Sequence, residues 1–367
     1  MPFDQAIESL LDVNLGCRKG ERLAIVTDDA PFNTATDEVP TRQALAELIA
    51  EKAQEREVDT LISIYPGGQE SGAEPPRHVF EQVYPAGFMA YLEETGLTEK
   101  LLDKSITAAE IGKLEKYLGS ASDSIDVMLV LSASSVSHTN FRRLLTRTKT
   151  ARVATMPGVE LEMFAGVMTA DWKMVEHRSE VAAEALTKAT EAEVHSADGR
   201  VLRFSLEGRD ATADTGIINQ PGQFGNLPGG EGFIAPIEGT AEGELSVGPP
   251  EEPGKWHFRF TKGELVEVLG DPPFMKRLDD VFAAHPIARN LAELGVGTNE
   301  KAKPCDSVLE SEKILGTVHL AVGDNAGFGG EVSVPFHQDF IVYQPTLVLR
   351  SEVGEESLVS DGRFMAD

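Results

Sequence analysis

The chain has 367 residues, which is too long for one small hydrophobic core and suits two domains of ordinary size. Hydrophobic residues make up 41% of the chain, so a packed interior is expected and a disordered chain is excluded. The formal net charge of -27 makes nucleic acid and an anionic membrane surface unfavourable partners.

Cysteine usage restricts the chemistry further. Cys17 and Cys305 are the only cysteines, which is neither a disulfide framework nor a thiolate zinc cluster. Any metal must therefore be bound by histidine and carboxylate side chains. The amino-terminal segment lacks the pattern of a secretory signal, and no apolar run approaches the roughly 18 residues of a membrane span. These features predict a cytoplasmic protein with no membrane partner.

The first half of the chain alternates helix-like and strand-like segments. Helical periodicity marks residues 3–15 and 41–55. Short apolar or β-branched runs predict strands at 22–26, 60–65, 126–131 and 152–155. This alternation predicts an α/β domain with a mostly parallel sheet and flanking helices.

A long helix is predicted over Ala170–Glu193, and a domain boundary is expected directly after it. Beyond this helix, short strands separated by glycine- and proline-rich turns indicate an α+β domain. They are expected at 201–206, 256–260 and 265–268. The predicted organisation is an amino-terminal α/β domain at 1–193 and an α+β metal-binding catalytic domain at 194–367.

Two histidines of the second half lie in strand-like sequence. His337 and Asp339 are two residues apart at the start of the β-rich run ending at Tyr343, so both side chains project from one face. His319 lies within the aliphatic run 314–322, which predicts a buried strand that ends in a glycine-rich loop. Each feature also has a structural interpretation, either a His–Asp hydrogen bond or a core histidine bonded to a carbonyl.

Two glutamates complete the candidate site. Glu231 lies between glycines that allow a sharp turn, and Glu293 is expected in the last turn of a helix over Ile287–Leu294 that Gly295 stops. A carboxylate near a helix C-terminus is electrostatically unfavourable, so a compensating cation is plausible there. The alternative for Glu293 is a solvated surface side chain.

The combination of two imidazoles and three carboxylates suits zinc, cobalt, manganese or ferrous iron better than calcium, which prefers oxygen ligands alone. Five ligands suffice for two divalent ions that share one carboxylate. Two such ions can activate a water molecule and polarise a carbonyl group. The combined set therefore predicts a two-metal hydrolytic centre.

Long ordered segments resemble the metallo-aminopeptidases typified by aminopeptidase T and aminopeptidase S. They include LGCRKGERLAIVTDD, NLPGGEGFIAPIEGTAEG, NLAELGVGTNEKAK, ILGTVHLAVGD and FHQDFIV. The resemblance implies metal ligands at Glu231, Glu293, His319, His337 and Asp339, with Asp339 expected to bridge the two ions. It also implies a homodimer that removes amino-terminal residues from short peptides.

One departure from this family concerns the loop after His319. The family's aminopeptidases carry a tyrosine there that stabilises the oxyanion, whereas this chain reads Gly323-Asp324-Asn325-Ala326-Gly327-Phe328, and its connection to His337 is shorter. Oxyanion stabilisation is then expected from the metals, from Asn325 or from loop amides. The expected catalytic residues are Glu231, Glu293 and Asn325.

A second branch of the superfamily resembles 2,5-dihydroxypyridine dioxygenase, a ring-opening enzyme with one ferrous iron. His319, His337 and Asp339 could form such an Fe(II) triad. That branch carries histidine at the position of Glu293, whereas this chain keeps both glutamates. The sequence therefore favours a metallo-aminopeptidase, with the oxygenase or a member that binds metal without turnover as alternatives.

Overall fold

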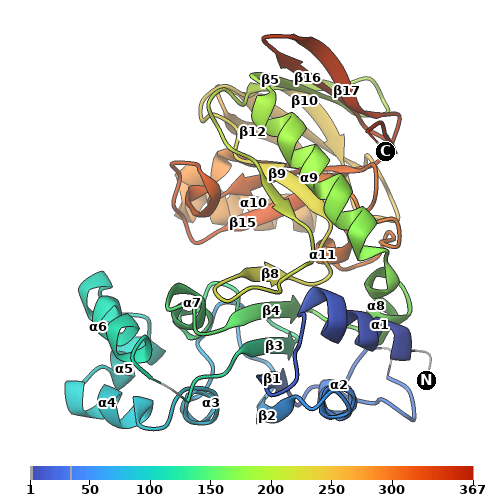
Figure 1. The fold of residues 1–367 in the computed structure, drawn as a ribbon. Helices are drawn as coiled ribbons and strands as arrows, with labels where there is room; N and C mark the ends of the chain where they lie inside the picture. The colour runs from blue at the N-terminus through green and yellow to red at the C-terminus, as the bar shows by residue number, and fades with distance from the viewer. Residues whose placement is uncertain (1–2, 34, 122, 367) are drawn as a thin grey trace. The chain divides into compact units, whose positions relative to one another are not determined.

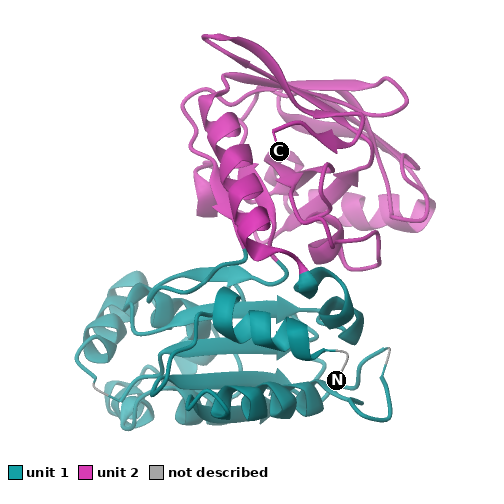
Figure 2. Cartoon of the chain, turned by 45° about the vertical axis from the view of Figure 1, so that its right-hand side comes forward, with its two compact units in different colours: residues 1–169, 216–228 teal, residues 170–215, 229–367 magenta. Residues whose placement is uncertain are grey.

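The structure is a computed structural model that describes residues 3–33, 35–121 and 123–366. The chain forms two compact units, and each unit takes segments from two places in the sequence (Figure 2). Unit 1 comprises Met1–Thr169 and Gly216–Pro228, and unit 2 comprises Ala170–Thr215 and Gly229–Asp367. Within the described ranges, no helix has both the length and the apolar composition that a bilayer crossing requires.

Unit 1 contains a five-stranded sheet in the order β2-β1-β3-β4-β8, with every neighbouring pair parallel (Figure 1). Its strands are β1 (Arg22–Asp28), β2 (Asp59–Tyr65), β3 (Val127–Ser132), β4 (Arg152–Pro157) and β8 (Phe224–Asn226). The central strand β3 is buried at every position, as expected for a parallel sheet covered on both faces. The α/β architecture predicted for this part of the chain is confirmed.

Three helices of unit 1 begin at side-chain caps that are visible in the sequence. The hydroxyls of Thr41, Thr107 and Thr139 accept backbone N–H groups at the starts of α2, α6 and α7. The helical segments are α1 (Asp4–Ser9), η1 (Leu10–Asn14), α2 (Arg42–Gln54), α3 (Arg77–Val83), α4 (Phe88–Thr95), α5 (Thr98–Leu102), α6 (Ala108–Leu118), α7 (Asn140–Arg147), α8 (Leu161–Ala165) and η2 (Val167–Thr169).

Unit 2 contains two sheets whose neighbouring strands are antiparallel. The eight-stranded sheet has the order β12-β11-β10-β6-β5-β16-β17-β18, and the five-stranded sheet has the order β15-β14-β13-β9-β7. Their strands are β5 (Glu191–His195), β6 (Val201–Ser205), β7 (Thr212–Asp214), β9 (Glu231–Ile234), β10 (Glu242–Val247), β11 (Trp256–Thr261), β12 (Glu264–Leu269), β13 (Leu291–Gly297), β14 (Val318–Gly323), β15 (His337–Val342), β16 (Thr346–Ser351), β17 (Gly354–Ser360) and β18 (Arg363–Phe364). The helical segments are α9 (Trp172–Lys188), α10 (Pro272–Ala284), η3 (Pro286–Arg289), α11 (Val308–Ser311) and η4 (Ala326–Phe328).

The five-stranded sheet turns one face toward the hydrophobic core of unit 2. Ile234, Leu294, Leu320 and Phe340 are paired neighbours across β9, β13, β14 and β15, and all four belong to that core. Helix α9 packs closely on β9 (Figure 1). Glycine at position 232 permits this approach, since a Cβ there would lie 2.7 Å from the Cβ of Ala182. Residues at the alternate positions of these strands therefore project from the opposite face, away from the core.

The helix predicted over Ile287–Leu294 is wrong. Only Pro286–Arg289 are helical, as the short segment η3, and Leu291–Gly297 form strand β13. Glu293 lies inside a fully buried strand, and Gly295 continues that strand. Pairing with β14 on one side and β9 on the other outweighs the local helical preference of this short apolar run.

The boundaries between the two compact units differ from the single boundary expected at 193/194. The predicted long helix ends at Lys188 as α9, and its last expected residues belong to β5. Helix α9 is part of unit 2, because Ala182 and Leu186 on its buried side join the core of that unit. Residues 216–228 return to unit 1, where β8 pairs with β4.

Candidate metal centre

All five predicted ligands lie on the face of the five-stranded sheet that is turned away from the core. The register aligns Gly295 with His319, and Ala321 with both Glu293 and Asp339, so these positions share one face. Glu231, at the start of β9, is opposite Gly297 and shares this face. His337 precedes Asp339 by two residues in β15 and projects the same way.

The side chains of these residues meet in one cluster. His319 Nε2 lies 3.1 Å from Glu231 Oε2 and 3.5 Å from Glu293 Oε1. His337 Nε2 lies 3.3 Å from Glu293 Oε2 and 3.4 Å from Asp339 Oδ1. Glu293 therefore contacts both imidazoles, one through each carboxylate oxygen.

Small residues on the same face make room for the cluster. A Cβ at Gly295 would lie 2.0 Å from His319 Nε2, so only glycine fits opposite this ring. A Cβ at Gly297 would lie 2.1 Å from the carbonyl oxygen of Ile314. The glycines of β13 thus serve the packing of the site, and the helix-stopping role expected of Gly295 does not apply.

The donor set fits divalent metal ions. The cluster contains two groups of three residues, and within each group the ligand atoms all lie within 4.8 Å of one another. One group is Glu231, Glu293 and His319, and the other is Glu293, His337 and Asp339. Among the described residues, buried His319 Nδ1 has no hydrogen-bond partner, and buried Glu231 Oε2 has only the 3.1 Å contact with His319 Nε2, which lies outside hydrogen-bond geometry. Burying polar atoms without good hydrogen bonds is costly, and a cation bound between Glu231 and His319 would reduce that cost.

The electrostatics of the metal-free cluster favour charged groups. Burial alone would raise the pKa of Glu231, but the Lys313 ammonium and His319 outweigh it and lower this pKa to about 2. Burial alone would lower the pKa values of His319 and His337, but the neighbouring carboxylates raise both well above 6.5. A metal ion held by these imidazoles would compete with protons for them, as is usual when histidine becomes a ligand.

Lys313 is a component of the site that the sequence did not reveal. Its side chain is 2% exposed, and its Nζ lies 2.6 Å from Glu231 Oε1 and 2.8 Å from Glu312 Oε1. Asp214 Oδ2 lies 3.7 Å from the same nitrogen. Burial, assisted by the charges of Asp339 and Glu231, raises the pKa of Glu312 to about 8. A lysine beside an aliphatic strand carries no sequence signal for burial, because lysine is normally exposed.

Asn325, expected to stabilise an oxyanion, is engaged elsewhere. It is fully buried, its Nδ2 donates to Glu238 Oε1 at 2.9 Å, and its Oδ1 accepts from the backbone N–H of Val332 at 2.9 Å. Both ends of the side-chain amide therefore organise the loop after β14. These contacts give no support to a direct catalytic role for Asn325.

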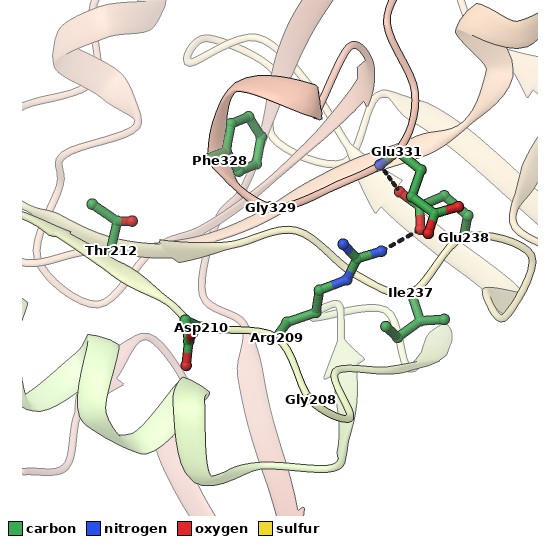
Figure 3. A pocket seen from close by; sticks show the side chains of 9 residues that line it. All are labelled: Gly208, Arg209, Asp210, Thr212, Ile237, Glu238, Phe328, Gly329 and Glu331. Atoms are coloured by element: carbon green, nitrogen blue, oxygen red, sulfur yellow. Dashed lines mark hydrogen bonds and ion pairs between the residues drawn. The ribbon is translucent and has the colours of Figure 1, made fainter.

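A pocket of about 660 Å³ is lined by residues before and within β7, after β9 and in the loop from β14 to β15, and none of the five candidate ligands lines it (Figure 3). Thr212 in its wall is paired with Phe233, which shares the ligand face with Glu231. Phe328, also in the wall, packs edge-on against Phe233 at 5.5 Å between ring centroids and lies 6.1 Å from the ring of His337. The pocket is large enough for a small ligand, and Phe328 is the wall residue whose ring also lies near His337.

Comparisons with known proteins find a partial match to one family model and two similar solved structures. The model of the NicX family, described as 2,5-dihydroxypyridine 5,6-dioxygenase, matches residues 119–251. The chain is similar to the structure of 2,5-dihydroxypyridine dioxygenase from Pseudomonas putida KT2440, with a TM-score of 0.69 and 16% identity over 100% of this chain and 97% of that one.

It is also similar to wild-type AmpT from Thermus thermophilus, with a TM-score of 0.59 and 17% identity over 100% of this chain and 99% of that one. No curated protein matches the chain. At these identities the likeness establishes the fold alone.

Proposed function

We propose that the chain is a metal-dependent aminopeptidase that releases amino-terminal residues from short peptides and holds two divalent ions. The observation that carries this proposal is the pair of ligand groups that share Glu293. Each group has one imidazole and two carboxylates, a donor set suited to zinc, cobalt or manganese. When bound, two such ions would lower the pKa of a shared water molecule and polarise the substrate carbonyl.

The geometry suggests a shared ligand other than Asp339, which the sequence analysis expected to bridge the two ions. Glu231 and His319 would hold one ion, His337 and Asp339 the other, and Glu293 would be shared because each of its oxygens faces a different imidazole. Glu293 therefore takes the place of Asp339 as the proposed bridging ligand. Lys313 leaves Glu231 only one oxygen for an ion, because Oε1 is already paired with its ammonium group.

The second candidate function is a mononuclear Fe(II) dioxygenase that opens an aromatic or heterocyclic ring. The family match at residues 119–251 and the similarity to the Pseudomonas putida enzyme favour it. Such iron sites use two histidines and one carboxylate. Among the described residues, neither ligand group combines both imidazoles, and this arrangement favours the two-ion hydrolase.

The experiment that separates the two candidates is metal counting followed by two assays. The metal-free protein is loaded with Zn²⁺, Co²⁺ or Mn²⁺, or with Fe²⁺ without oxygen, and the bound ions per chain are measured by elemental analysis. Two ions per chain and hydrolysis of unblocked dipeptides are expected. One iron per chain with oxygen consumption on 2,5-dihydroxypyridine would overturn the aminopeptidase proposal.

A ligand variant sharpens the same test. Asp339→Asn should reduce the count from two ions to one and lower peptide hydrolysis at least a hundredfold, because the His337 group loses a charged ligand. The matched control is Asp361→Asn, an exposed acid in the turn between β17 and β18. A fully active Asp339→Asn protein with two bound ions would contradict the ligand assignment.

A further inference from the structure

Glu238, a residue outside the metal ligands, connects three loops of unit 2. It follows β9 in the chain, and its carboxylate forms an ion pair with Arg209 from the loop before β7 (Figure 3). The same carboxylate accepts hydrogen bonds from Asn325 Nδ2 at 2.9 Å and from the backbone N–H of Glu331 at 2.8 Å. Asn325 and Glu331 belong to the loop that leads from β14 to β15.

The loop from β14 to β15 is closed tightly around Asn325. The backbone N–H groups of Gly330 and Val332 both donate to this residue, the first to its carbonyl oxygen and the second to its side chain. A Cβ at Gly330 would lie 1.9 Å from Asn325 Cγ, so the chain passes directly against the amide. The position of this loop therefore depends on where Glu238 holds Asn325.

The same loop orients the imidazole of His337. The carbonyl oxygen of Asp324 lies 2.8 Å from His337 Nδ1, and a carbonyl can only accept, so Nδ1 carries the proton. Asp324 is itself held by its backbone N–H, which donates to Phe336 O at 2.8 Å. With Nδ1 held in this way, Nε2 is the ring nitrogen that faces Glu293 and Asp339 and that a metal ion would bind.

We propose that Glu238 is a positioning residue that, through Asn325 and the Asp324 carbonyl, fixes the tautomer and the orientation of the metal ligand His337. This inference rests on the proposed metal centre and identifies a residue that supports it from outside. Partners of this kind orient metal-bound histidines, and their loss typically costs about 10- to 100-fold in metal affinity. The Arg209 ion pair helps to hold the Glu238 carboxylate in place, and the negative charge of this carboxylate strengthens the hydrogen bonds that it accepts.

The chain offers a matched control for this role. Glu331 lines the same pocket as Glu238 but joins the network through its backbone N–H, which a side-chain substitution leaves in place. Glu331→Gln therefore removes one negative charge from the pocket and keeps the network. Glu238→Gln removes the same charge and also weakens the links to Arg209 and Asn325.

The test compares wild type, Glu238→Gln and Glu331→Gln by two measurements. In the metal-free protein, ¹⁵N–¹H spectra of the histidine side chains report whether His337 Nδ1 carries a slowly exchanging proton. Calorimetric titration with Zn²⁺ reports the affinity of the metal centre that includes His337. Glu238→Gln should lose the slowly exchanging Nδ1 proton and bind Zn²⁺ about 10- to 100-fold more weakly, whereas Glu331→Gln should match wild type in both measurements.

A second variant protects the test against misfolding. Asn325→Asp keeps the shape of the side chain but replaces the donor that faces Glu238 with an acceptor, so it should reproduce the loss seen in Glu238→Gln. Equal behaviour of Glu238→Gln, Asn325→Asp and Glu331→Gln in both measurements would overturn the inference. If wild type binds no Zn²⁺, the proposed metal centre fails, while the metal-free spectra still decide the role of Glu238.

Discussion

Lys313 is a lysine in an unusual environment, because its side chain is almost fully buried. An ammonium group that is almost fully buried is tolerated only when it is paired, and Glu231 and Glu312 supply the partners at hydrogen-bonding distance. The pKa of Lys313 is raised well above its usual value, because the three neighbouring carboxylates outweigh the cost of its burial. Lys313 thus acts as a built-in cation beside the site where divalent ions are proposed.

Removing this built-in cation should destabilise the metal-free protein. Lys313→Met leaves the buried Glu231 carboxylate without its ammonium partner, and breaking a buried ion pair in this way costs about 3–5 kcal/mol. Urea unfolding in the presence of a chelator measures the loss. Lys301→Met, the same change at an exposed position, should stay within about 0.5 kcal/mol of wild type. Equal unfolding midpoints for the two variants would contradict the role of Lys313.

At the scale of elements, strand alternation separates the chemistry from the core. In β14 and in the Glu293–Gly297 part of β13, apolar residues lie on one face, and glycine, alanine or a candidate ligand lies on the other. Gly295 has the most demanding position, because the ring of His319 occupies the space that a side chain would need. The element that carries Glu293 therefore also creates the space for His319.

Gly295→Ala should disrupt this arrangement. The added methyl group would overlap His319 Nε2, and relieving such overpacking typically costs about 1–3 kcal/mol. Thermal unfolding should show the destabilisation, and calorimetry should show weaker Zn²⁺ binding, since the ring must move. Gly327→Ala is the control, because a Cβ there meets nothing within 4 Å. The packing argument fails if both variants bind Zn²⁺ as wild type does.

At the scale of the whole molecule, the acidic surplus sets the response to salt. A net charge of -27 produces self-repulsion that opposes the compact state. Salt screens this repulsion, and the screening length falls from about 30 Å at 0.01 M to about 3 Å at 1 M. The folded chain is therefore expected to gain stability as ionic strength rises.

This expectation is tested by the Tm of the chelator-treated protein. The Tm should rise as KCl increases from 0.01 M to 0.5 M and should level off beyond that, because the screening length is then already short. Sucrose in place of KCl serves as the control, since it does not screen charge. A Tm that is independent of KCl, or that falls with it, would show that the acidic surplus does not limit stability.

Several features of the fold and site were predictable from local pattern. Alternating helices and apolar strands predicted the parallel sheet of unit 1. Threonine caps mark the starts of three of its helices, α2, α6 and α7. The strand environment of His319 and the shared face of His337 and Asp339 also follow from periodicity, because side chains in a strand alternate between two faces.

Other features depend on contacts between distant parts of the chain. Glu293 was assigned to a helix because a short apolar run fits both periodicities, and only its pairing with β9 and β14 makes it a strand. The burial of Lys313, the engagement of Asn325 by Glu238 and the sharing of Glu293 between two imidazoles arise in the same way. Local sequence states which face a side chain occupies, whereas the register between strands far apart in the chain sets which charges meet and at what distance.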